Sequence, residues 1–441
     1  MLPQFRNRCA DFYKKSRNQR FIHILLISLL LRILLMPFFG HIDVLSEARR
    51  VYFWAENNIF FDDIARNTTM LIEVLFYKAT SFLLPDEFSM FHIDNIKYST
   101  SSIPHSFEFV SHYSIFRTMF VLKLPFLFFD LLTAVVLYNY FDNKENALDS
   151  CKMWLFNPIT IFAFYVFGRF ESIPIFFIAA SLLALKRQRF VLAAILLGLC
   201  LNGREMMIIY SPLFIVAMFF ASFKQIDLPR KLLAITIIFG FTVLALQLYT
   251  FVLPEVQNAA GGKAGTIIHE GRVRYLFDFA IDRIMLIPFV YALLLIWLAS
   301  DNSPMHNKLL LACGLAMMSF FAFSTHTAHF TSWMIIFPAF FYGYNKNLLM
   351  PFVGLCVSWF LYWIVLTDPG VFTTWLASAY SLHFIGFPNI PMYIEEFSQN
   401  MGIFDRTMLI YLFRSVWVAS LLYLAAQMIR ITLKKQHEMP S

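Results

Sequence analysis

The sequence predicts an all-α, polytopic membrane protein, in which a bundle of about twelve transmembrane helices is joined by helical extracytoplasmic loops. Two observations lead to this fold class. Hydrophobic residues make up 59% of the 441-residue chain, including 53 phenylalanines, whereas soluble domains are only about half apolar. The apolar residues also gather in runs of roughly 15 to 25, close to the length that crosses a bilayer. An ordinary soluble domain is therefore excluded.

The expected spans follow one another in order, separated by polar turns or longer polar segments. Residues 1–20 form a basic N-terminus, and the apolar run after it lacks the small-residue cleavage site of a signal peptide. We therefore expect a retained first span at 21–39. The later spans are expected at 115–140, 152–168, 172–186, 190–203, 206–223, 231–253, 284–300, 308–324, 330–344, 348–367 and 407–430.

The basic residues set the expected orientation. A cytoplasmic N-terminus also places in the cytoplasm Lys144, the basic tract at 186–189, Lys224, Arg230, Lys231, Lys308, Lys346 and the C-terminal tail at 431–441. This arrangement satisfies the positive-inside rule, and the reverse one would place nearly all these clusters outside. The same rule explains the net charge of +7, so nucleic acid is not an expected partner.

One membrane domain, residues 21–430, is expected to include three outer segments at about 40–114, 254–283 and 368–406. The first of these carries ten acidic and five basic residues. Because long polar segments of a membrane protein are the natural places for a site outside the lipid, we look for function on this face.

Costly polar residues from separate spans converge on that outer face. Asp43 follows the first span, Arg169 and Glu171 join the third to the fourth, Arg204 and Glu205 join the fifth to the sixth, and His326 and His329 join the ninth to the tenth. A charge in the hydrocarbon costs roughly 2.5–3.5 kcal/mol on the translocon scale. Unrelated structural charges would be divided between both faces, so the convergence predicts a site.

Structural alternatives stay open for these residues. Asp43 is also placed to cap a helix, and Glu47, one helical turn later, can share its face. Arg169 and Arg204 can extend to lipid phosphates at the interface. Arg32, inside the first span, is either part of a site or a structural group paired with Asp130 or with backbone carbonyls. His326 and His329 lack a third ligand that a zinc site would require.

Five segments, in this order, carry a family resemblance. They are LLLRILLMPFFGHIDVLSEARRVYFWAENN, KLPFLFFDLLTAVVLY, WLFNPITIFAFYVFGRFESIPIFFIAASLLAL, AAILLGLCLNGREMMIIYSPLFI and HTAHFTSWMIIFPAF. Together they resemble the integral-membrane glycosyltransferases of the GT-C fold, in particular the mannosyltransferases of GPI-anchor synthesis and bacterial relatives that act on envelope glycans. The eukaryotic GPI branch has an Asp-x-Asp pair where this chain has His41, Ile42 and Asp43.

The resemblance implies transfer of a sugar, with mannose favoured, from a polyprenyl-phosphate donor to a lipid or glycan acceptor at the extracytoplasmic face, with inversion. In this interpretation Asp43 is the general base and Glu47 the second candidate. Arg204 and Arg169 bind the donor phosphate. Sugar or acceptor binding falls to Glu171, Glu205, His326 and His329. No cofactor is implied, and the single carboxylate at Asp43 does not favour a divalent metal.

Two rival functions remain at this stage. A glycolipid transporter or flippase also needs many spans and intramembrane charges, although neither an internal repeat nor midplane clustering is visible here. A noncatalytic scaffold subunit of a glycan-assembly complex is compatible with the missing second aspartate. The sequence favours a plasma or inner membrane, or the endoplasmic reticulum in a eukaryote.

Overall fold

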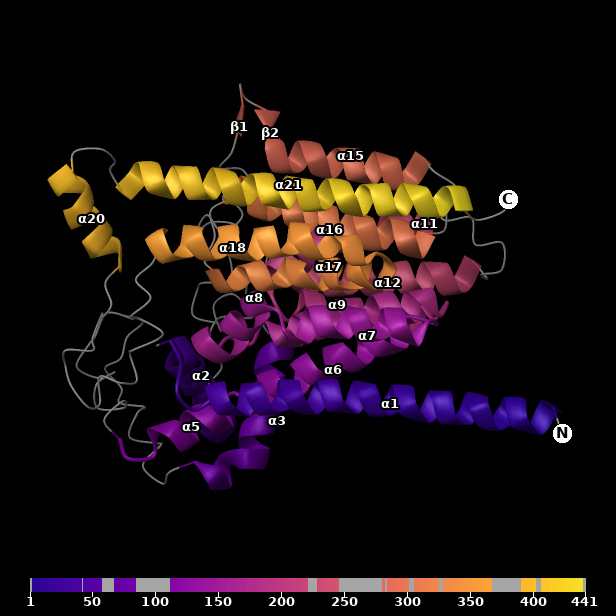
Figure 1. Cartoon of the computed structure of the whole chain (residues 1–441), viewed down its shortest axis with the longest axis horizontal. Helices are drawn as coiled ribbons and strands as arrows, with labels where there is room; N and C mark the ends of the chain where they lie inside the picture. Colours follow the sequence, from indigo (N-terminus) through magenta and orange to yellow (C-terminus); the bar gives the residue numbers. More distant parts are fainter. Residues whose placement is uncertain are drawn as a thin grey trace, which may run out of the picture.

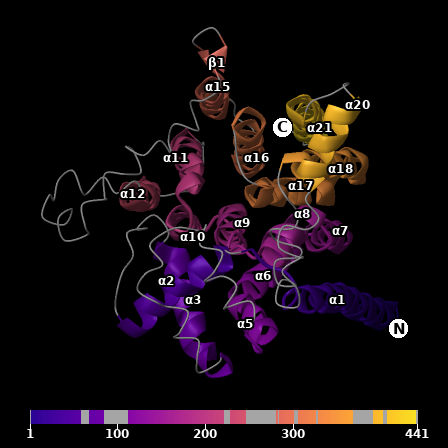
Figure 2. The same cartoon turned by 90° about the vertical axis from the view of Figure 1, so that its left-hand side faces the viewer.

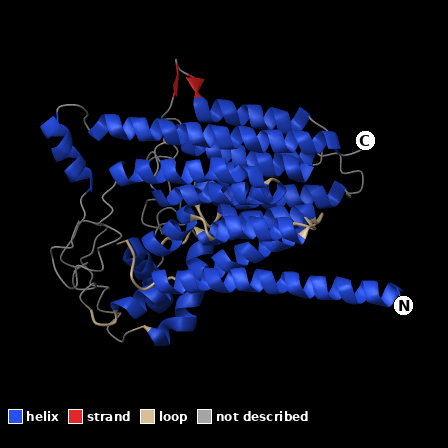
Figure 3. Cartoon of the chain, in the orientation of Figure 1, coloured by secondary structure: helices blue, strands red, loops and turns tan. Residues whose placement is uncertain are grey.

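The computed structural model of the chain describes residues 2–41, 43–57, 67–84, 112–220, 228–245, 280–281, 284–300, 305–324, 328–366, 390–401 and 406–438. The predicted all-α character is confirmed for nearly all of them (Figure 3). One departure is a two-residue strand pair, β1 (Ala280–Ile281) antiparallel to β2 (Ile284–Met285). The regular secondary structure of the described residues is otherwise helical, as the apolar runs predict.

The helices occur in the following order. In the N-terminal half they are α1 (Leu2–Leu35), α2 (Asp43–Asn57), α3 (Asn67–Thr80), η2 (Ser81–Leu83), α5 (Ile115–Leu122), α6 (Leu124–Tyr140), α7 (Lys144–Leu155), α8 (Pro158–Ile161), the π-helical η4 (Phe162–Phe167), α9 (Ser172–Lys186), α10 (Phe190–Leu201), η5 (Glu205–Ile209) and α11 (Tyr210–Phe220). They continue as α12 (Leu228–Ala245), α15 (Leu286–Ser300), α16 (Met305–Phe323), η8 (Ala328–Thr331), α17 (Ser332–Tyr344), η9 (Lys346–Leu348), α18 (Leu349–Leu366), α20 (Ile390–Met401) and α21 (Arg406–Glu438).

Every predicted span overlaps at least one of these helices, but the helix lengths do not confirm the count of about twelve. Among the described residues, 5 helices are long and apolar enough to cross a membrane, or up to 7 if each of two bent helix pairs is one span. Four other apolar helices have 10–17 residues. The chain is thus a helical membrane protein in which many apolar helices are shorter than a standard span.

The helices lie side by side in an elongated bundle, and different helices lie at its two ends (Figure 1). The start of α1 and the end of α21 lie at one end, and α2, α3, α5 and α20 lie at the other. Figure 2 looks along the bundle, with α1 near its lower edge and α15 and α21 near its upper edge. The described helices of the predicted outer segments thus lie at the same end of the bundle, opposite the termini, with α20 on a different side of that end from α2 and α3 (Figures 1 and 2).

The basic residues of the predicted inner loops meet at the end that holds the termini. The Lys346 ammonium lies 2.7 Å from the carboxylate of Asp149, and Arg20 lies 3.3 Å from Glu145. Lys186 donates to the carbonyl of Tyr140. These contacts form a polar layer that joins α1, α6, α7, α9 and η9 at this end of the bundle.

Two prolines bend the helices that lead to the opposite end. Pro125 lies in the first turn of α6, where α5 and α6 meet at 40°, and Pro158 starts α8 after a bend of 45°. Proline removes a backbone donor and clashes with the preceding turn. The side chain of Asn157 restores part of the lost bonding by accepting from the amides of Ile159 at 2.8 Å and Thr160 at 3.3 Å.

Arg32 is paired with Asp130 in the bundle core, as one of its structural alternatives predicted. The guanidinium Nε lies 2.6 Å from Oδ2 of Asp130, and Nη1 also donates to the carbonyl of Ser28 at 3.1 Å. Trp154 Nε1 and the Tyr165 hydroxyl donate to the same carboxylate at 2.7 and 2.6 Å. A buried charge that is both paired and hydrogen-bonded is a structural anchor, so Arg32 leaves the list of site candidates.

Candidate functional site

The site begins where the chain leaves α1 and enters α2. The backbone amide of His41 donates to the carbonyl of Phe167 at 2.9 Å, and the amide of Val44 donates to the carbonyl of His41 at 2.9 Å. These bonds hold the first residue of α2, Asp43, against the turn that connects η4 to α9. Residues far apart in the sequence therefore meet here by backbone pairing, before any side chain contributes.

Gly168 makes the close approach of α2 to this turn possible. Its φ of +85° is in the left-handed region, which glycine adopts at little cost. A Cβ at this position would lie 2.6 Å from Cγ2 of Val44 and 3.0 Å from Cε of Lys123. Both the turn and the packing thus require glycine between Phe167 and Arg169.

Four charged side chains form a continuous chain through the site. Arg169 Nη1 lies 3.1 Å from Oδ2 of Asp43, and its Nε lies 3.9 Å from Oε1 of Glu171. The same Glu171 oxygen lies 4.0 Å from Nε of Arg204. The indole N–H of Trp333 donates to the other Glu171 oxygen at 2.6 Å. The structure thus brings Asp43, Arg169, Glu171 and Arg204 together, as the sequence predicts.

The four charged side chains differ in exposure, and the Asp43 end of the chain is the most exposed. The Asp43 side chain is 27% exposed and that of Arg169 is 9% exposed, whereas Arg204 is 4% exposed and Glu171 is fully buried. Buried ions are tolerated when they are paired. The accessible member is therefore the carboxylate of Asp43, and Glu171 lies behind the two arginines that it orients.

Aromatic rings enclose the two guanidinium groups. That of Arg204 lies 4.7 Å from the ring centroid of Phe330, 5.3 Å from that of Phe170 and 5.5 Å from that of Trp333. Arg169 lies 4.9 Å from the Phe170 ring. Cation–π contacts of this kind stabilise a desolvated cation. Both arginine side chains are therefore held inside the protein, at 9% and 4% exposure.

Two histidines flank the ring of Phe167. The rings of His41 and Phe167 are stacked, with centroids 4.3 Å apart. His329, on η8, has its ring centroid 4.4 Å from that of Phe167. His329 is 3% exposed. The amide of Asp43 donates to Nδ1 of His41 at 3.2 Å. His329 thus joins the site as predicted, and His41 is a site residue that sequence reasoning did not select.

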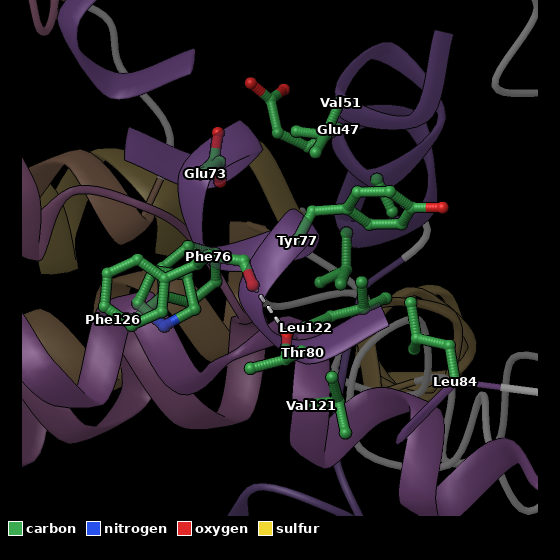
Figure 4. Close-up of a pocket in the computed structure, with 13 residues that line it drawn as sticks. Glu47, Val51, Glu73, Phe76, Tyr77, Thr80, Leu84, Val121, Leu122 and Phe126 are labelled. Atoms are coloured by element: carbon green, nitrogen blue, oxygen red, sulfur yellow. Dashed lines mark hydrogen bonds between the residues drawn. The ribbon is translucent and has the colours of Figure 1, made fainter. Parts of the chain in front are cut away.

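Glu47 faces a different space from Asp43, although both lie on α2. It lines a small, partly open cavity of about 30 Å³ between α2, α3, α5 and α6 and lies 3.6 Å from Arg50. In Figure 4, Glu47 and Glu73 lie on one side of this cavity, with Val121, Leu122 and Leu84 on the other. The two acidic candidates are therefore separated, because Asp43 reaches beyond the start of the helix while Glu47 packs toward α3.

Tyr77 on α3 also lines this cavity. Burial, together with the nearby carboxylate of Glu56, raises the pKa of its hydroxyl. The hydroxyl therefore remains protonated at neutral pH, and it cannot supply a phenolate to this cavity.

Two predicted residues are not placed by the structure. His326 lies outside the described residues. Glu205 begins η5, but its side chain lies outside the described portion. Among the described residues, no group of three His, Cys, Asp or Glu side chains is arranged to hold a metal ion.

Lys123 and Trp333 are further site neighbours that sequence reasoning missed. Lys123 is a charged residue inside an expected span, so the same energetic cost that singled out Arg169 would have identified it. Trp333 gave no such signal, because apolar aromatic residues are frequent throughout this sequence. Comparison of the chain with models of protein families and with curated proteins finds no match.

Proposed function

We propose that the protein is a membrane glycosyltransferase that moves a sugar, with mannose favoured, from a polyprenyl-phosphate donor to a lipid or glycan acceptor. The observation that carries this proposal is the ion-paired chain from Asp43 through Arg169 to Arg204. It places one accessible carboxylate beside two guanidinium groups, and these are the groups that the reaction needs.

The arginines suit the leaving group of this reaction. As the bond from the anomeric carbon to the phosphate oxygen breaks, its electron pair moves onto the phosphate, whose negative charge grows. Fixed cations beside that oxygen stabilise the transition state more than the ground state. Arg204 is fixed by Glu171 and by three aromatic rings, so we assign it the main phosphate contact, with Arg169 second.

Asp43 suits the role of general base. The acceptor oxygen attacks the anomeric carbon, and its proton passes to the carboxylate. In the resting protein this carboxylate is paired with Arg169 at 3.1 Å. A donor phosphate that competes for Arg169 releases Asp43 for proton transfer, so the base becomes available when the donor is bound. Glu47, the second candidate, lines the separate cavity between α2 and α3 and is the less suitable base.

The remaining predicted residues divide by accessibility. Glu171 is fully buried and contacts both arginines, so we assign it to orienting them and not to sugar binding. His41, which the sequence did not single out, has a side chain that is 18% exposed beside Asp43, so we assign it the contact with sugar hydroxyls. His329 is 3% exposed and packs against the ring of Phe167, so it supports this part of the site from inside the protein. The basic residues at the opposite end of the bundle favour an extracytoplasmic location for the site.

The proposal is tested in proteoliposomes with polyprenyl-phosphate mannose, glucose and arabinose and an acceptor lipid extract. We expect transfer from one donor by the wild type, a loss of at least a hundredfold in Asp43→Asn, and unchanged donor binding. Equal transfer by Asp43→Asn would move the base to Glu47. Movement of the intact sugar lipid across the bilayer without transfer would instead identify a flippase, and neither activity would favour a scaffold.

A further inference from the structure

Lys123 occupies the break between α5 and α6 and is fully buried. Its ammonium donates to the backbone carbonyls of Met36 and Tyr165, each at 2.9 Å, and to that of Phe39. An ammonium has three hydrogens to donate, so the three carbonyls use all of them. No carboxylate of the described residues pairs with this lysine, which distinguishes it from Arg32, Arg169 and Arg204.

The three carbonyls belong to the two segments that carry the site. Met36 and Phe39 lie between the end of α1 and Asp43, and Tyr165 lies in η4, four residues before Arg169. Among the described residues, one backbone–backbone hydrogen bond joins these two segments, from the amide of His41 to the carbonyl of Phe167. The Lys123 ammonium therefore lies where it can fix the separation of Asp43 from Arg169.

The packing around Lys123 leaves its position little freedom. The Cε atom of Lys123 would lie only 3.0 Å from a Cβ atom placed on Gly168. Glycine at that position thus admits the lysine stem as well as α2. The Lys123 ammonium, the left-handed turn at Gly168 and the start of α2 therefore pack together around Asp43, the proposed base.

We infer that Lys123 is a positioning residue, whose ammonium sets the distance between the Asp43 carboxylate and the Arg169 guanidinium. This inference rests on the proposed function for the roles of those two residues. A mainly structural lysine would stabilise the fold without altering the site. A positioning lysine also affects the chemical step, while leaving donor binding by Arg204 largely intact, since Arg204 is held by Glu171 and aromatic rings instead.

Lys123→Met tests the inference because it keeps the length of the side chain and removes the donors. We expect kcat per folded molecule to fall at least tenfold, with the donor KM changed less than threefold. Lys308→Met is the matched control, since Lys308 is also buried, at 2% exposure, but lies on α16. Its kcat should stay within twofold of the wild type. Lys123→Gln, which keeps two donor hydrogens, should recover part of the loss.

A second measurement does not depend on catalysis. With cysteines at His41 and Phe167, whose rings are stacked, oxidation with copper phenanthroline should form a disulfide, identified by mass spectrometry. We expect it to form at least fivefold more slowly with Lys123→Met and at an unchanged rate with Lys308→Met. If Lys123→Met does not fold, Lys123→Gln replaces it.

The two measurements separate the inference from the proposed function. If no donor supports transfer by the wild type but the disulfide forms more slowly in the Lys123 variant, the proposed function fails and the positioning role stands. If the disulfide rate and kcat are unchanged while thermal stability falls, Lys123 is purely structural and the inference is overturned.

Discussion

The hydroxyl of Thr69 donates to the backbone carbonyl of Gly203 at 2.8 Å. The amide of Thr68 also donates to the carbonyl of Asn202 at 3.1 Å, so the start of α3 is fixed against the turn that precedes Arg204. A helix from the first outer segment thereby supports the arginine that we assign to the donor phosphate.

Thr69→Val should weaken donor binding. The change keeps the shape of the side chain and leaves the buried carbonyl of Gly203 without its donor, a loss of about 1–3 kcal/mol. Because Arg204 follows that carbonyl, we expect the donor KM to rise about three- to tenfold. Thr68→Val is the control, since the Thr68 contact uses the backbone. Asn67, Thr68 and Thr69 also form an Asn-x-Thr glycosylation sequon that Thr69→Val removes, so both variants are expressed in a bacterial host that does not glycosylate it. An equal rise in both variants would contradict the assignment.

Arg204→Lys should impair donor binding although it preserves the charge. Lysine cannot form the planar, bidentate contact with a phosphate, nor stack as well against Phe330 and Trp333. We expect the donor Kd to rise at least tenfold in equilibrium binding with a polyprenyl phosphate. Arg187→Lys, at the end of the bundle near the termini, should bind normally. Normal binding by Arg204→Lys would remove this residue from the phosphate site.

Gly168→Ala should reduce both stability and activity. The left-handed φ costs an L-residue roughly 1–2 kcal/mol, and the added methyl collides with Val44. We expect a lower Tm and a kcat loss of at least tenfold. Val44→Ala in the same chain should recover part of the Tm, because it removes the colliding methyl but not the backbone strain. Gly354→Ala is the control, since nothing lies within 4 Å of its added carbon.

Asp130→Asn should destabilise the bundle without a specific effect on catalysis. Arg32 would keep its buried charge and lose its ionic partner, which typically costs about 3–5 kcal/mol. We expect a marked fall in Tm in detergent, with the donor KM of the remaining folded protein unchanged. Glu145→Gln, in an exposed ion pair with Arg20, should leave the Tm almost unchanged. A Tm equal to that of the wild type for Asp130→Asn would mean that the pair is not an anchor.

The convergence of Asp43, Arg169, Glu171 and Arg204 was predictable, because charged residues at the ends of apolar spans are excluded from the hydrocarbon and must lie at one of the two membrane faces. The pairing of Arg32 with Asp130 was predictable from the same cost of a charge in the hydrocarbon. In each case an isolated charge in lipid is energetically costly, so the charges must pair or leave the hydrocarbon. A charged residue within or beside an apolar run can be recognised from the sequence alone.

Other features depend on geometry that the sequence does not display. Spacing allowed Glu47 to share the face of Asp43, but a side chain at the start of a helix can point away from the helix while the next turn packs against a neighbouring helix. The three carbonyls around Lys123 come together only when α1 and η4 are already in place. Span number was also unpredictable from apolar runs alone, since proline bends and short helices alter how each run becomes a span.

The charges of Asp43, Arg169, Glu171 and Arg204 sum to zero, and this neutrality affects the proposed catalytic cycle. The resting site offers little net attraction to soluble anions, so inorganic phosphate should inhibit poorly. After sugar transfer, Asp43 holds the acceptor's proton and Arg169 holds the spent carrier. When Asp43 loses that proton, it again competes for Arg169 and helps to displace the carrier. In the proposed cycle, proton loss would thereby be coupled to product release and would reset the site for the next donor.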